Sequence, residues 1–265
     1  LPSGLAIGQF GDQTFRAGRS SDPATDLIGD LDLGWYGALD LGGIGTPATL
    51  KMAGTLRSKS GKGILYFDLS DQPAVAAAND VIEVSGNLDL DFGYTTVNIN
   101  PYAGALVANT PYTLIKYGGS LLGGIGNLNV PPPSRALNAA VSTVPGEVRV
   151  TFTPSGQSAA NLLWTGNGYY WDVNASQSWL NGGNPDNFQQ LDGVTFNDTG
   201  SLFDVEVVAA VAPASITVDT ANTFRIWGGG SLNGGTDMTL TKKGSGTLRI
   251  ETANIMVGSP ILVSA

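Results

Sequence analysis

Short segments in which apolar and polar residues alternate recur along the whole chain, and they limit what it can fold into. Alternation places every second side chain on one face of a β-strand. The segments are 27–33, 82–90, 97–99, 148–152, 205–207, 216–218 and 248–250. No stretch keeps the i, i+3, i+4, i+7 spacing of an amphipathic helix, and the best helical candidate, 74–78, has only five residues. The sequence therefore predicts an all-β fold whose strands are mostly three to five residues long.

Phrases of Gly, a polar residue and Leu recur between these segments. They stand at 54–56, 86–88, 119–121, 126–128, 230–232 and 246–248. Such a phrase suits a coil that turns and then re-enters a strand. The inward positions are chiefly Leu, Ile and Val, which stack well between successive coils. Sandwiches and barrels also use short strands, but these features favour a parallel β-helix, or β-solenoid, with turns rich in Gly, Asn and Asp.

Composition excludes several classes of site. The 265 residues include no Cys and no His, so there is no disulfide, no Cys or His metal site and no Ser-His-Asp triad. The 13 Lys and Arg are scattered among 22 Asp and Glu, and the net charge of −9 argues against binding nucleic acid. No apolar run approaches the roughly 18 residues of a membrane-spanning helix, so we expect no membrane insertion. An acidic chain without Cys suits an exported, extracellular protein.

The chain is expected to divide near residue 158. The segment 153–160, Thr-Pro-Ser-Gly-Gln-Ser-Ala-Ala, has the composition of a linker. Aromatic residues become dense directly after it. We therefore expect one part at 1–158 and a second at 159–265.

The second part resembles a known repeat. The matching residues are Trp164-Thr165-Gly166, Trp171-Asp172, Trp179, the run 192–198 and the phrase Leu-Thr-Lys-Lys-Gly-Ser-Gly-Thr-Leu at 240–248. In order and spacing they are similar to the autotransporter-associated β-strand repeat of large bacterial surface proteins. The runs 80–88 and 112–119 resemble the end of such a module. The resemblance implies a passenger-like β-helix at the bacterial cell surface. It makes 1–158 the C-terminal part of one repeat module and 159–265 the start of the next.

Aromatic side chains at the start of the second part are candidates for binding sugars. An exposed aromatic ring can stack on the apolar face of a sugar, and the candidates are Trp164, Tyr170, Trp171 and Trp179. The alternative is that these rings plug the open end of a coil or fill a corner between modules. Their place in the repeat pattern favours this structural role.

Asp and Asn residues of the same part suggest a calcium site. Oxygen ligands from loops suit Ca²⁺, and the candidate ligands are Asp186, Asp192 and Asp198. No EF-hand spacing or calcium-binding nonapeptide repeat accompanies them. Asp and Asn are also the usual residues of tight turns, and this alternative is favoured. Calcium is the one cofactor that the residues suggest.

Two Asp-Leu-Asp triplets raise the question of catalysis. Asp30 and Asp32, and likewise Asp89 and Asp91, would share one face of a strand, as the acid and base of a polysaccharide hydrolase or lyase would. The alternative is a solvated outer face, with Leu31 and Leu90 pointing into the core. Because both leucines fit that role, we assign no catalytic residue.

These observations predict a structural protein, not an enzyme. We expect a non-enzymatic extracellular β-solenoid, part of a stalk, adhesin or surface fibre. Its partners would be further copies of itself, end to end. The apolar run 261–263 has no charged residue that would keep another strand from pairing with it. Surface glycans are a second expected partner. The alternative functions are a glycan-binding module that uses the Trp cluster, and a β-helical glycoside hydrolase or lyase that uses the Asp pairs.

Overall fold

The chain is built from strands, as the alternating segments predict. The computed structural model describes residues 5–7, 13–17, 29–34, 37–42, 45–58, 63–91, 94–232, 238–252 and 261–263. Positions 27 and 28 of the first alternating segment lie outside these residues. Among the described residues there is no α-helix, and two 3₁₀ turns occur at Ala76–Ala78 (η1) and Ile125–Asn127 (η2). The best helical candidate therefore forms a single 3₁₀ turn, and the all-β prediction is confirmed.

Two compact units make up the chain. Unit 1 consists of Leu1–Asn100, Ala105–Pro132 and Asn138–Pro154, and unit 2 of Pro101–Gly104, Pro133–Leu137 and Ser155–Ala265. No helix in the described part has the length and apolarity that a membrane crossing requires. The predicted boundary between repeat modules stays a prediction.

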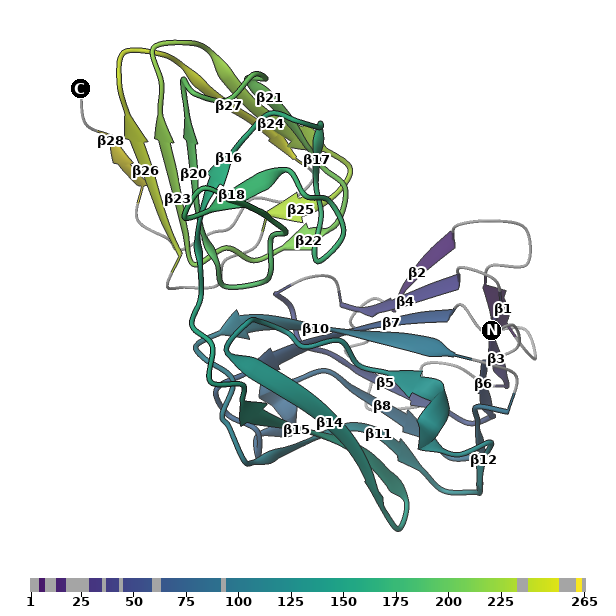
Figure 1. Cartoon of the computed structure of the whole chain (residues 1–265). Coiled ribbons are helices and arrows are strands. Elements are labelled where there is room, and N and C mark those ends of the chain that lie inside the picture. Colours follow the sequence, from purple (N-terminus) through teal and green to yellow (C-terminus); the bar gives the residue numbers. More distant parts are fainter. Residues whose placement is uncertain are drawn as a thin grey trace. The chain divides into compact units, whose positions relative to one another are not determined.

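Unit 1 contains three sheets of five strands each, whose positions in the fold are shown in Figure 1. Sheet A has the order β1 (Leu5–Ile7), β3 (Leu31–Leu33), β6 (Leu56–Ser58), β9 (Leu88–Asp89), β12 (Leu121–Leu122). Sheet B has the order β13 (Leu128–Asn129), β10 (Thr95–Ala103), β7 (Gly63–Ser70), β4 (Gly37–Leu41), β2 (Gln13–Ala17). Sheet C has the order β14 (Leu137–Val144), β15 (Glu147–Pro154), β11 (Pro111–Tyr117), β8 (Val81–Val84), β5 (Thr49–Met52).

From β3 to β14 the strands of unit 1 pass through sheets A, B and C in turn, so that strands paired in parallel are one circuit through the three sheets apart. The register aligns like residues: Leu31 faces Leu56, and Leu56 faces Leu88. All three side chains are buried. Leu90 is buried as well, so the prediction that Leu31 and Leu90 point into the core is confirmed. The pairing is parallel from β5 through β8 to β11, and β15 then pairs antiparallel with β11.

Unit 2 repeats this pattern. Sheet D has the order β19 (Asn184–Asp186), β18 (Trp179–Asn181), β16 (Asn161–Trp164), β20 (Gly193–Asn197), β23 (Ser215–Asp219), β26 (Thr239–Lys243), β28 (Ile261–Val263). Sheet E has the order β17 (Tyr170–Trp171), β21 (Asp204–Val207), β24 (Phe224–Gly228), β27 (Leu248–Thr252), and β22 (Ala210–Val211) pairs with β25 (Ser231–Leu232). The pairing is parallel except for two antiparallel pairs, β16 with β18 and β18 with β19.

Glycine forms the corners between strands. The Leu of every Gly-polar-Leu phrase lies at or next to the first residue of a strand, namely β6, β9, β12, β13, β25 and β27. At one corner of unit 1 the backbones stack directly: the Gly86 N–H donates to the Gly54 carbonyl at 3.0 Å, and the Gly119 N–H donates to the Gly86 carbonyl at 2.8 Å. A Cβ atom at Gly86 would overlap the Gly54 carbonyl oxygen. This close approach between successive circuits leaves no room for a side chain.

The Gly86→Ala variant should therefore lose about 1–3 kcal/mol of unfolding free energy, the usual range for overpacking a filled site. Gly126→Ala is the matched control, because the same phrase there has no atom within 4 Å of an added Cβ. We expect that control to be neutral or slightly stabilising. Urea unfolding followed by circular dichroism measures both. Equal stability of the two variants would contradict the stacked corner.

Candidate functional site

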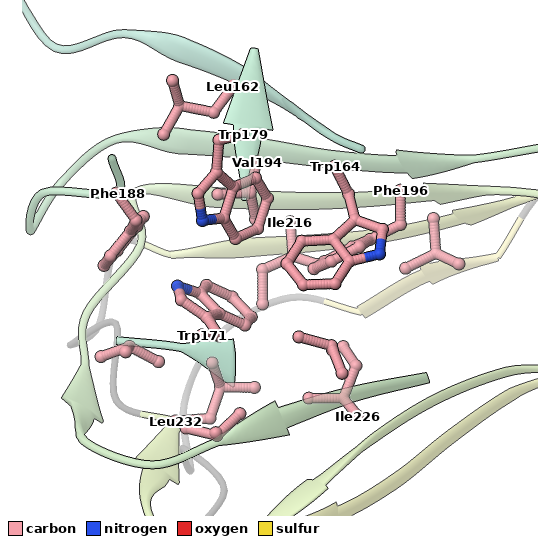
Figure 2. Close-up of a cluster of buried hydrophobic side chains, with 14 of the residues drawn as sticks. Leu162, Trp164, Trp171, Trp179, Phe188, Val194, Phe196, Ile216, Ile226 and Leu232 are labelled. Carbon is pink, nitrogen blue, oxygen red and sulfur yellow. The ribbon is translucent and has the colours of Figure 1, made fainter. Parts of the chain in front are cut away.

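The three predicted tryptophans lie in the core of unit 2 (Figure 2). Trp164, Trp171 and Trp179 are each at most 1 % exposed. Ring centroids are 5.1 Å apart between Trp164 and Trp179 and 5.4 Å apart between Trp171 and Trp179, both in edge-on geometry. Such packing of large rings dominates the stability of a core. Since no face of these rings is open, the hypothesis of an exposed sugar-stacking platform does not fit them.

Tyr170 is the one candidate of this group that is exposed, with 52 % of its surface accessible. It lies on β17 of sheet E, where the register places Glu206 and then Trp227 beside it on the next two strands. The guanidinium of Arg225 stands 4.9 Å from the centre of the Trp227 ring and pairs with Glu251 at 2.7 Å. Sheet E therefore carries two aromatic rings, those of Tyr170 and Trp227, near the ion pair of Arg225 and Glu251.

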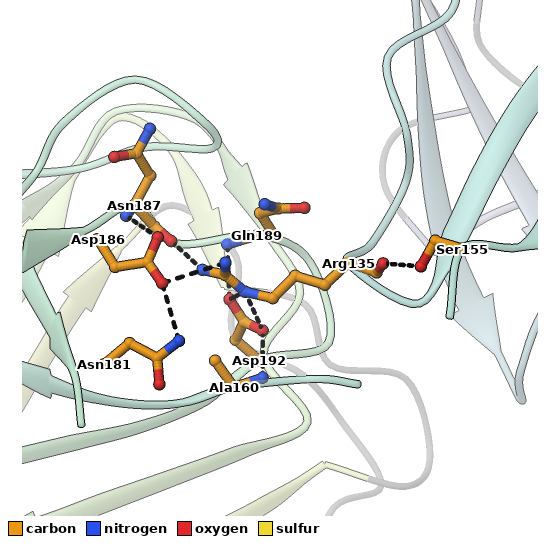
Figure 3. A network of polar contacts seen from close by, with 8 residues as sticks. All are labelled: Arg135, Ser155, Ala160, Asn181, Asp186, Asn187, Gln189 and Asp192. Carbon is orange, nitrogen blue, oxygen red and sulfur yellow. Dashed lines mark hydrogen bonds and ion pairs between the residues drawn. The ribbon is translucent and has the colours of Figure 1, made fainter. Parts of the chain in front are cut away.

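The guanidinium of Arg135 joins two of the three predicted calcium ligands (Figure 3). The Arg135 guanidinium contacts Asp186 at 3.1 Å and Asp192 at 2.9 Å, and it donates to the Asn187 carbonyl. Asp192, which is fully buried, also accepts the Ala160 N–H at 2.8 Å and the Gln189 N–H at 2.9 Å. Burial nevertheless raises the pKa of Asp192 above its ordinary value.

The third predicted ligand, Asp198, serves a different turn. Its carboxylate accepts the Thr220 hydroxyl, the Ala221 N–H at 2.9 Å and the Asn222 side-chain amide at 2.9 Å. The hydrogen bond from Thr220 is the main reason why the pKa of Asp198 is lowered. In the described part of the chain no group of three or more Asp or Glu is placed to hold a metal ion. The three carboxylates do not meet, and their contacts are those of turn and ion-pair chemistry.

The Asp-Leu-Asp triplets are engaged by neighbouring groups. Arg57 on β6 contacts Asp30 at 2.6 Å and Asp32 at 3.4 Å. The register places Arg57 beside Asp32 on one strand and Asp89 on the other. Asp89 in turn accepts the Asp91 N–H at 3.1 Å. An acid and base for glycoside hydrolysis must both face the substrate, and the contacts of Asp30 and Asp32 with Arg57 do not favour that role.

Three further carboxyl groups, those of Asp40, Asp68 and Asp80, are buried in unit 1, and sequence reasoning missed them. Asp68 and Asp80 are 3 % and 1 % exposed. Asp80 accepts the Ala48 N–H at 2.6 Å and the Asp68 N–H at 2.8 Å, while Asp68 accepts the Thr46 N–H at 2.9 Å. Burial raises the pKa of Asp68 to about 7, and burial together with the charge of Asp68 raises that of Asp80 to about 9. The pair therefore retains a proton near neutral pH while it anchors backbone N–H groups at a corner.

Comparison with known proteins adds no relative: the chain matches no family model, no curated protein sequence and no solved structure. The class that the fold defines is an all-β protein of mostly parallel sheets, with large buried aromatic residues and carboxylates held at its corners. The resemblance to the autotransporter-associated repeat stays a prediction.

Proposed function

We propose that the chain is a parallel β-helix with a structural or adhesive role, part of an extracellular stalk or fibre at a bacterial surface. The observation that carries the proposal is the in-register parallel pairing of strands one circuit apart, with Leu31, Leu56 and Leu88 buried in line. A circuit of this kind cannot bury its apolar side chains alone, so stability accumulates as circuits stack.

End-to-end assembly of copies is the second element of the proposal. Within the described residues, β27 pairs with β24 on one side only, and β12 pairs with β9 on one side only. A strand edge of this kind presents backbone donors and acceptors to another chain. Ile250 on β27 packs against the core of unit 2, so that a further circuit would continue the same apolar stack.

Among the described residues, the contacts of the candidate side chains favour a structural role over a catalytic one. Of the Asp pairs, Asp30 contacts Arg57, and Asp89 accepts the backbone N–H of Asp91. The rings of the Trp cluster are buried. The support for an extracellular location is the resemblance stated above, together with the acidic composition of the chain. Surface glycans remain the expected second partner.

Light scattering and negative-stain electron microscopy over a range of concentrations test the assembly. We expect elongated particles that lengthen with concentration. Ile250→Lys should abolish the lengthening, because an inward-pointing charge on an edge strand blocks edge pairing. Arg249→Lys, the adjacent exposed position, is the control and should assemble normally.

A chain of two copies joined in tandem tests covalent stacking. If the coil continues across the junction, the two copies should melt together at a higher temperature than one copy. The proposal is wrong if the single chain stays monomeric at every concentration and the tandem chain melts like a single copy.

A further inference from the structure

The strand β14 is a long edge strand without charge. It stands at the end of sheet C, beside β15, so that within the described residues it has a neighbour on one side (Figure 1). Its eight residues, Leu-Asn-Ala-Ala-Val-Ser-Thr-Val, include no Asp, Glu, Lys, Arg, Gly or Pro. The open side of an edge strand presents a row of backbone N–H and C=O groups with which another strand can pair.

The other edge strands of the described sheets are shorter, and the longest of them carry charge. The edge strands of four or five residues, β2, β5 and β27, contain Arg16, Lys51 and Arg249. The remaining edge strands have two or three residues and are β1, β12, β13, β17, β19, β22, β25 and β28. Short length and charge are usual means of preventing edge pairing, and β14 has neither.

The hairpin of β14 and β15 holds this edge in place. The two strands are joined by Pro145-Gly146, and a turn of two residues makes them antiparallel. Gly146 has a φ of 80°, as the residue after Pro in a type II turn does. Its carbonyl accepts the Tyr117 N–H from β11 at 2.8 Å. A partner strand would therefore meet an edge that is already ordered, which lowers the entropic cost of binding.

One face of β14 carries apolar side chains that the sheet covers incompletely. The two-residue turn places Val141 opposite Val150 and Ala139 opposite Phe152. Val150 and Phe152 on β15 are fully buried, whereas Val141 and Ala139 on β14 are half-buried. The burial of this apolar row therefore decreases at the edge strand, and one more strand would complete it.

We propose that β14 pairs antiparallel with β14 of a second copy of the chain, so that sheet C continues through a twofold dimer. With the axis at Ala140, Ala139 of one copy would lie opposite Val141 of the other, and both would stay on the half-buried face. A second copy supplies an uncharged strand with the same alternation. The net charge of −9 opposes association of two copies, and β14 brings no charged side chain of its own into the contact.

This contact goes beyond the end-to-end assembly proposed above. The same strand is used by both copies, so the contact closes with two chains, whereas stacking at β27 would continue from copy to copy. Ile250→Lys, the variant expected to abolish lengthening, lies on β27 in unit 2 and should leave the β14 contact intact. The two assemblies can therefore fail independently.

Sedimentation velocity over a range of concentrations tests the dimer. We expect the Ile250→Lys chain to form dimers whose mass does not rise further. Adding Ala140→Lys should leave monomers at concentrations where that chain is dimeric, because two like charges would lie opposite each other. Ala140 is exposed, so this change should not affect folding. Thr153→Lys is the matched control: it adds the same charge at an exposed position of β15, which is not an edge strand, and should remain dimeric.

A mixture of two variants tests whether the occupant is a second β14. Chains with Ala140→Lys and chains with Ala140→Glu should each be monomeric alone, and an equal mixture should form dimers because the charges at the axis are then opposite. Melting curves confirm that each variant is folded. The proposal is overturned if the Ile250→Lys chain stays monomeric at every concentration or grows beyond two copies. It is also overturned if Ala140→Lys remains dimeric, if Thr153→Lys dissociates to the same extent, or if the mixture stays monomeric.

Discussion

Replacing Arg135 with Met is expected to destabilise unit 2 by about 3–5 kcal/mol, the usual effect of removing one partner of a buried ion pair. The cause is Asp192, which has no exposed surface and would keep a charge that two backbone N–H groups alone must balance. Arg135 also secures its own segment, since the Ser155 hydroxyl donates to its carbonyl oxygen. Urea unfolding followed by Trp fluorescence measures the loss, because four of the five Trp residues lie in unit 2.

Two further variants isolate the buried charge as the cause. Arg249→Met removes an Arg whose side chain is 62 % exposed and which contacts Glu251 at 3.0 Å, so its loss should be within about 1 kcal/mol. Adding Asp192→Asn to Arg135→Met should recover part of the stability, since a neutral amide is less costly to bury unpaired. If Arg135→Met and Arg249→Met prove equally mild, Asp192 does not depend on Arg135.

The strands and corners of this fold were predictable from the sequence because both are local properties. Alternation over three residues, as in Leu31–Leu33, is enough to assign one face to the core. The Gly-polar-Leu phrases mark where the chain re-enters a strand, since the close approach at Gly86 excludes any Cβ atom. Which strands pair with each other was harder to predict, because pairing depends on how many residues the chain uses for a whole circuit through the sheets.

The site residues were harder to predict because their roles depend on distant contacts. Arg135 and Asp192 are 57 positions apart, and no spacing links them. Asp186 and Asp192 are residues of the type that binds calcium. The positive group that contacts them is the guanidinium of Arg135, and nothing in the sequence pattern connects Arg135 with these two residues. Asp68 gave one signal that was missed: it is an acid within the otherwise largely apolar strand Gly63–Ser70, at a buried position.

The aromatic cluster, for which the sequence favoured a structural role, could not be assigned residue by residue for a different reason. β17 has only two residues, Tyr170 and Trp171, too few for alternation to show which ring points inward. One is 52 % exposed and the other is fully buried. Composition alone therefore identified an aromatic-rich segment but could not separate its core residues from its surface residues.

Trp171→Ala is expected to lower the unfolding free energy of unit 2 by about 3–5 kcal/mol, as deletion of a large buried side chain does. The ring stands 5.4 Å from both Trp179 and Phe188 and 5.6 Å from Phe196, measured between centroids. Its Nε1 has no hydrogen-bond partner among the described residues, so the loss is one of packing. Urea unfolding followed by the remaining Trp fluorescence measures it.

Tyr170→Ala on the same strand is the matched control and should change stability by no more than about 0.5 kcal/mol, because its ring faces outward. The glycan-platform hypothesis predicts the opposite pattern. A ring that stacked on sugar at position 171 could be removed with little loss of stability and a clear loss of glycan binding. A stable, folded Trp171→Ala chain with impaired glycan binding would therefore place this ring at the surface and contradict the aromatic core.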